Sequence, residues 1–149
     1  MNFPPVSVFV LLLPLVVSAC IPEKRNGVLV AKFSSESPAF IFKPNILLPS
    51  PENGYRISYD FRKGEDICVL TGEPDNKEIP TEDNCPGMKG KGKLSCNNGK
   101  SMKLGWVLTS CIGGFGQSMG KGEPKFVFAF GHNKERALDQ LIEGKQGVK

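Results

Sequence analysis

Two stretches with a period of two constrain the fold of this chain most. Residues 55–61 (YRISYDF) place their aromatic and aliphatic side chains on one face and their polar side chains on the other. Residues 125–131 (KFVFAFG) place Phe126, Phe128 and Phe130 on one face and smaller residues between them. A period of two is the pattern of a β-strand that buries one face. The sequence therefore predicts two strands, and residues 55–61 are the clearest half-buried strand of the chain.

Shorter runs rich in β-forming residues surround these two stretches. They cover residues 28–33, 39–42, 66–70, 93–96 and 102–108 and are separated by Gly, Pro and Asn. Such spacing is typical of antiparallel strands joined by short turns. The dipeptide Asn98-Gly99 predicts a primed hairpin turn. The prolines in residues 44–54 exclude a continuous central strand there, and residues 72–91 are expected to form a long loop.

One helix is predicted, at the C-terminal end. Asn133 is a suitable N-cap, Leu138, Leu141 and Ile142 fall on one stripe of residues 134–143, and Gly144 is a suitable stop. The expected fold is mainly β, a small barrel or sandwich of antiparallel strands, with one short C-terminal α-helix.

The N-terminal residues resemble a processing signal. Residues 6–17 are almost wholly apolar but shorter than the ~20 residues that span a bilayer. Small residues follow and end at Cys20, so that residues 17–20 (VSAC) resemble the lipobox of bacterial lipoproteins. That resemblance implies cleavage before Cys20, acylation of its thiol and amine, and attachment to the membrane, with Ile21 favouring the periplasmic face of the outer membrane. The alternative is an ordinary secretory signal and a secreted protein.

The chain is accordingly divided into a signal peptide (1–19), a lipid anchor and tether (20–27) and a single β-rich domain (28–149). Residues 50–85 carry a net charge of −5 and residues 86–125 a net charge of +6. We expect the two segments to pair in the fold. The basic segment can also form a face toward phosphate-bearing lipid or polysaccharide.

Four cysteines remain after Cys20, an even number that predicts two disulfides in an exported chain. Three pairings are possible. We favour Cys68–Cys85 and Cys96–Cys111, because each closes a short loop. A zinc site is disfavoured, because the chain has no C-x-x-C spacing and only one histidine, His132.

The candidate binding residues are Lys89, Lys91, Lys93 and Trp106. The three lysines alternate with glycines in residues 88–93 (MKGKGK) and can contact phosphates by charge, although a solvated edge strand is the simpler interpretation. No aromatic residue interleaves them, so nucleic-acid binding is not indicated. Trp106 is expected in the core near Phe126, Phe128 and Phe130, with ligand stacking as the alternative.

No catalytic constellation is evident. Residues 113–122 are dense in glycine, but they match neither the dinucleotide fingerprint nor the P-loop. The carboxylates Glu78, Glu82 and Asp83 fall in the predicted long loop, where nothing tunes their pKa values. We therefore predict no catalysis, no metal and no cofactor, and a carboxylate-based hydrolase is the least favoured alternative.

Residues 94–108 (LSCNNGKSMKLGWVL) resemble the C-type lysozyme inhibitor lipoproteins, which are small exported β-barrels. The Ser-Gly-x-x-Tyr loop of that family has no match here. The chain as a whole is similar to small uncharacterised exported β-rich proteins. The expectation is a membrane-anchored envelope lipoprotein with a binding or structural role, whose partner is an envelope protein or an anionic lipid or polysaccharide. The alternative is an inhibitor or binder of a secreted enzyme.

Overall fold

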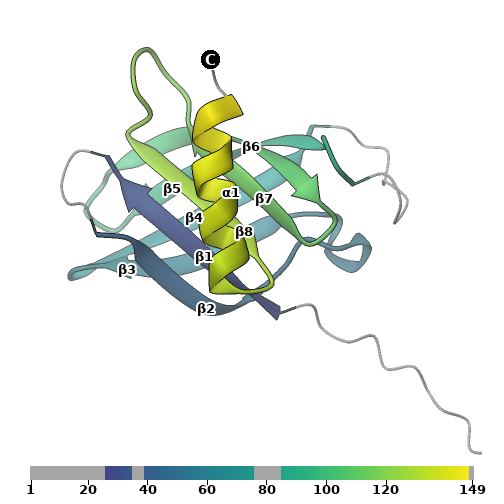
Figure 1. Ribbon diagram of the computed structural model, residues 1–149. Coiled ribbons are helices and arrows are strands. Elements are labelled where there is room, and N and C mark those ends of the chain that lie inside the picture. The colour runs from purple at the N-terminus through teal and green to yellow at the C-terminus, as the bar shows by residue number, and fades with distance from the viewer. Residues whose placement is uncertain (1–25, 35–38, 76–84, 148–149) are drawn as a thin grey trace, which may run out of the picture.

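The computed structural model describes residues 26–34, 39–75 and 85–147, which form one sheet and one long helix (Figure 1). The elements in chain order are β1 (Asn26–Phe33), β2 (Ile41–Leu47), the 3-10 turn η1 (Pro51–Asn53), β3 (Ile57–Lys63), β4 (Asp66–Pro74), β5 (Lys89–Cys96), β6 (Ser101–Ser110), β7 (Gly113–Ser118), β8 (Phe126–Gly131) and α1 (Lys134–Gly147).

The strands form an antiparallel meander that curls into a nearly closed barrel. Their order is β2-β1-β8-β7-β6-β5-β4-β3, and β2 and β3 at the two ends of this order contact each other. Helix α1 lies across the outside of β1, β7 and β8 (Figure 1). The expected mainly β fold with a C-terminal helix is confirmed.

Large aromatic side chains fill the barrel, and glycines make room for them. Trp106 and Phe128 are fully or almost fully buried in one interior cluster, as the sequence predicts. A Cβ atom added to Gly90 would overlap the indole ring of Trp106, and one added to Gly116 would overlap the ring of Phe128. Gly72 also lies against the indole ring. Alternation of large and small interior residues allows eight strands to close around a solid core.

A second, smaller cluster lies outside the barrel and holds the helix. Ala137 and Leu141 of α1 pack on Val30, Phe115, Val127 and Ala129 of the sheet. The predicted N-cap is confirmed, because the Oδ1 atom of Asn133 accepts a hydrogen bond of 2.9 Å from the amide of Arg136. Gly144 does not end the helix, which continues to Gly147; Gly144 packs instead against the ring of Phe115.

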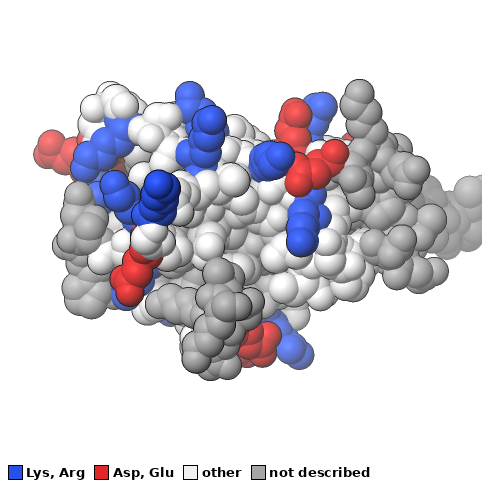
Figure 2. Space-filling view, turned by 90° about the horizontal axis from the view of Figure 1, so that it is seen from above, with Lys and Arg blue, Asp and Glu red and all other residues white. Residues whose placement is uncertain are grey.

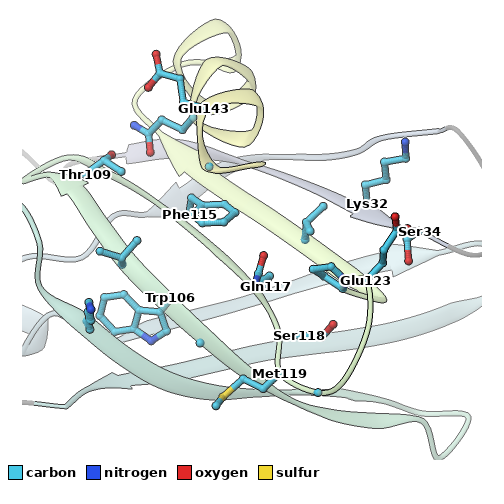
Figure 3. A pocket seen from close by; sticks show the side chains of 18 of the residues that line it. Lys32, Ser34, Trp106, Thr109, Phe115, Gln117, Ser118, Met119, Glu123 and Glu143 are labelled. Atoms are coloured by element: carbon cyan, nitrogen blue, oxygen red, sulfur yellow. The ribbon is translucent and has the colours of Figure 1, made fainter. Parts of the chain in front are cut away.

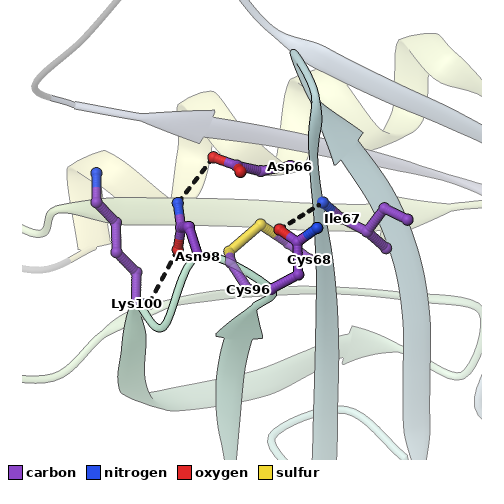
Figure 4. Close-up of a disulfide and its surroundings, with 7 residues drawn as sticks. Asp66, Ile67, Cys68, Cys96, Asn98 and Lys100 are labelled. Carbon is purple, nitrogen blue, oxygen red and sulfur yellow. Dashed lines mark hydrogen bonds between the residues drawn. A yellow bond between two sulfur atoms is a disulfide. The ribbon is translucent and has the colours of Figure 1, made fainter.

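The disulfide pairing that we favoured is wrong. The structure pairs Cys68 with Cys96 and Cys85 with Cys111. Cys68 and Cys96 lie directly opposite each other on neighbouring antiparallel strands, and Figure 4 shows this bridge beside the turn that follows β5. Strand adjacency brings the thiols together, whereas the number of intervening residues, which guided our choice, carries no information on adjacency.

Three local expectations also change. The lysine-bearing strand β5 pairs with both β4 and β6, so it is not an edge strand. The predicted long loop is shorter, because β4 extends to Pro74 and β5 begins at Lys89. In the turn after β5, Gly99 has a positive φ of 86° and Asn98 does not, so the hairpin lacks the predicted primed turn.

Candidate functional site

Alternate hairpin turns of the meander meet at one end of the barrel, and they bring five lysines together. Phe33 at the end of β1 and the loop between β7 and β8 border a pocket of about 800 Å³. This pocket is here named the lysine end after its five basic residues, which are Lys63, Lys100, Lys103, Lys121 and Lys125. They come from β3, from β6 with the turn before it, and from the β7–β8 loop.

Hydrogen bonds and a disulfide fix two of the segments that carry these lysines. The Oγ atom of Ser118 accepts hydrogen bonds from the amides of Lys125 and Phe126, at 2.9 and 3.2 Å, which closes the base of the β7–β8 loop. The side chain of Asn98 donates a hydrogen bond to Asp66 and accepts one from the amide of Lys100 (Figure 4). Together with the nearby Cys68–Cys96 bridge, these contacts order the turn before β6.

The lysine end carries an excess of positive charge. Glu123 is the one acidic residue that lines this pocket beside the five lysines. The Nζ atom of Lys63 lies 4.4 Å from the centre of the Phe33 ring, a cation–π contact. Two ion pairs of the described residues, Lys43–Asp60 and Arg56–Glu73, lie outside the basic segment of residues 86–125. Strand β4 of the acidic segment pairs with β5 of the basic segment, with Glu73 opposite Lys91, so the two segments are neighbours in the sheet. The lysines that line the pocket lie together at one end of this sheet.

A second concavity, here named the outer groove, lies on the outside of the barrel between α1 and the β7–β8 loop. Its volume is about 1290 Å³, which exceeds the ~300–1,000 Å³ of ordinary small-molecule sites. Small and apolar residues form much of its floor: Gly105, Val107, Phe115 and Val127. Figure 3 shows Phe115 and Gln117 between Thr109 on one side and Glu123 with Ser34 on the other.

The outer groove and the lysine end meet at the β7–β8 loop. Ser118, Met119, Gly120, Gly122, Glu123 and Pro124 line both of them. The side chain of Met119 is 56 % exposed and stands beside Gly105, while its amide donates a hydrogen bond to the carbonyl of Lys103. Figure 2 shows blue side chains on both sides of the view, with red ones among them and uncharged white surface between the two groups. Charge and apolar surface therefore adjoin along one loop.

The candidate residues from the sequence are distributed over several surfaces. Lys89 lines the outer groove, whereas Lys91 and Lys93 point outward from β5 and line neither concavity. Gly90 and Gly92 between them point into the barrel, which explains the Gly-Lys alternation as packing on one face and solvation on the other. Trp106 borders the outer groove but is only 3 % exposed, so its ring belongs to the core.

Sequence reasoning missed the lysine end, although one signal was present. Lys63 precedes Gly64, Lys100 follows Gly99, and Lys121 lies between two glycines. Each of these glycines has a positive φ and marks a hairpin turn or loop. In a meander every second turn falls at the same end, so lysines beside alternate turns are brought together.

The described residues offer little for acid–base or metal chemistry. No group of three or more His, Cys, Asp or Glu side chains could hold a metal ion within the described ranges. His132 is exposed and contacts the side chain of Asn133. The hydroxyl of Tyr59 is buried in the barrel without a hydrogen-bond partner among the described residues, and burial raises the pKa of Tyr59 well above its ordinary value.

Several predicted features lie outside the described residues. They are the signal segment, Cys20 and the loop carboxylates Glu78, Glu82 and Asp83. Within the part of the chain that the structure covers, no helix is long and apolar enough to cross a membrane. No family model, curated protein or solved structure matches this chain.

Proposed function

We propose that this protein is a lipid-anchored lipoprotein of the bacterial cell envelope that binds an anionic ligand at the lysine end. The ligand carries phosphate or carboxylate groups, as envelope lipids and polysaccharides do. The observation that carries the proposal is the convergence of five lysines from separate elements on one pocket that has a single acidic residue. We propose binding and not catalysis, because the sequence contains no recognisable catalytic motif.

The position of the N-terminal strand supports this role. β1 begins at Asn26 and ends at Phe33, which lines the lysine end, so the tether joins the barrel at the opposite end. At ~3.3 Å per residue, the seven steps between them span about 23 Å. A lipid on Cys20 would therefore hold the barrel by one end and present the lysine end away from the anchoring point.

The anchor is tested by the intact mass of the protein purified from bacterial membranes. The wild type is expected to begin at Cys20 and to carry the added mass of acyl chains, and a Cys20→Ala variant is expected to stay unprocessed. A soluble wild-type protein with an unmodified N-terminus contradicts the lipid anchor and supports secretion instead.

Ligand binding is tested with fluorescently labelled polyphosphate, and uncharged dextran serves as the negative control. Lys103 and Lys121 are exposed, so a double Lys→Gln variant at these positions is expected to keep the fold. Loss of two exposed charge contacts at roughly 0.5 kcal/mol each should weaken polyphosphate binding about fivefold at 0.15 M salt.

The matched control removes the same charge from β5 through Lys91→Gln and Lys93→Gln, which line neither concavity. An equal loss of affinity in the control would show that polyphosphate responds only to net charge. That result, or no binding by the wild type, would contradict a site at the lysine end.

A further inference from the structure

We infer that the ligand is an anionic amphiphile, whose headgroup binds at the lysine end and whose hydrocarbon chain lies in the outer groove. This inference rests on the proposed function and adds to it the chemical class of the ligand. A free anion or a hydrophilic polymer would use the lysine end alone and would leave the larger concavity without a role.

The lysine end and the outer groove are continuous with each other. Ser118 at the end of β7 and five residues of the β7–β8 loop line both, and the loop is held at its base by Ser118 and by the Met119–Lys103 hydrogen bond. A ligand that follows this loop passes from lysines to an apolar floor without a break. A ligand with a charged part joined to an apolar part is an amphiphile.

The outer groove has an apolar floor and no excess of charge. Val107 and Phe115 supply apolar floor, and Gly105 between Leu104 and Trp106 leaves open space above β6. The nearest atoms to an added Cβ at Gly105 are those of Met119, at 3.8 Å. The acidic and basic residues of this groove, Lys32, Lys89, Glu123 and Glu143, balance each other, in contrast with the lysine end. Charge therefore selects the headgroup at one end only.

The experiment measures binding of lysophosphatidylglycerol to the purified full-length chain below the concentration at which micelles form. Trp106, the single tryptophan, borders the groove and serves as the fluorescent reporter beside calorimetry. Full burial of one CH₂ group corresponds to about a fourfold change in Kd, so a half-open groove should give about twofold. Lengthening the acyl chain from 10 to 14 carbons should therefore lower Kd about 16-fold.

Two groove variants test the location of the chain. Gly105→Leu fills the open space without contacting the core, and Met119→Glu places an acidic group on an exposed side chain at the junction. Each is expected to weaken binding of the 14-carbon ligand about tenfold. Gly105→Leu should also abolish the dependence on chain length. Ser58→Leu adds the same side chain to an exposed position on β3 and should bind as the wild type does.

The headgroup is tested by the double variant Lys103→Gln and Lys121→Gln. It should lose the preference for lysophosphatidylglycerol over lysophosphatidylcholine and keep the dependence on chain length.

Equal Kd values for 10 and 14 carbons, or unchanged binding by both groove variants, would overturn the inference. If polyphosphate still binds in that case, the proposed function stands without the amphiphile. If polyphosphate does not bind either, the proposed function fails as well.

Discussion

Substitution of Gly90 by alanine tests the packing of the barrel interior directly. Gly90 lies on β5 opposite Trp106 on β6, and the indole ring occupies the space that a side chain at position 90 would need. An added Cβ would overlap ring atoms Cε2 and Cζ2 and lie 2.5 Å from the carbonyl oxygen of Glu73. The ring is buried and the carbonyl belongs to a paired strand, so neither can move without cost.

The expected loss of stability follows from two opposing effects. Overpacking of a core costs ~1–3 kcal/mol, and a clash on two sides places Gly90→Ala at the upper end. The replacement of glycine by alanine in a strand returns ~0.5–1 kcal/mol. We therefore expect the free energy of unfolding to fall by about 2 kcal/mol, and Tm by roughly 8 °C.

Gly105→Ala is the matched control, because it makes the same change in the neighbouring strand on the outer face. Its added Cβ meets only Met119, at 3.8 Å, so its stability should equal or exceed that of the wild type by about 0.5 kcal/mol. Urea unfolding followed by Trp106 fluorescence gives both values. If Gly90→Ala is as stable as Gly105→Ala, the reasoning about glycine and aromatic packing is refuted.

Three further predictions concern the disulfides, the buried phenol and the helix. Replacement of both Cys68 and Cys96 by serine opens a loop of 28 residues and should cost about 3.5 kcal/mol in the chain-entropy model, measured by urea unfolding under non-reducing conditions. Burial raises the pKa of Tyr59, so the stability that its neutral phenol contributes is present below pH 10 and is lost as the pH rises further. Tyr59→Phe should remove this part of the alkaline loss of stability without lowering stability at neutral pH, because the buried hydroxyl has no hydrogen-bond partner among the described residues. An unchanged alkaline profile of the Tyr59→Phe variant would argue against this role of the phenol. Asn133→Ala removes the N-cap of α1 and should cost about 1 kcal/mol, whereas an unchanged Tm would show that packing alone holds the helix.

Local patterns predicted most of the strands, because alternation and turn residues are properties of neighbouring positions. The strand predicted from Tyr55 begins instead at Ile57, because Gly54 and Tyr55 both adopt left-handed φ values of 63° and 55°. The period-two pattern does not reveal this left-handed backbone, because Tyr55 is buried together with the inward residues of β3. Similarly, the glycine-dense residues 113–118 gave no strand pattern, and they become β7 because Phe128 and Phe130 cover them.

The candidate site depended on long-range arrangement and was predicted less well. The basic excess of residues 86–125 was visible in the sequence, but the members of the lysine end were not. Lys63 and Lys121 are far apart in the chain, and only the order of the strands places them around one pocket. The disulfide pairing failed for the same reason, since Cys68 and Cys96 meet only through the register of β4 and β5.

The contact between β2 and β3 gives the barrel a seam. β2 carries Pro44, which has no amide hydrogen, and Asn45, whose φ of 57° interrupts the extended backbone. Such an edge is a poor template for a strand from another molecule, so it disfavours edge-to-edge association through β2. The Cys68–Cys96 bridge joins β4 to β5, and the Cys85–Cys111 bridge joins the segment before β5 to the turn after β6, so neither crosses the seam. Separation of β2 from β3 would therefore break no disulfide and would leave β4 cross-linked to β5.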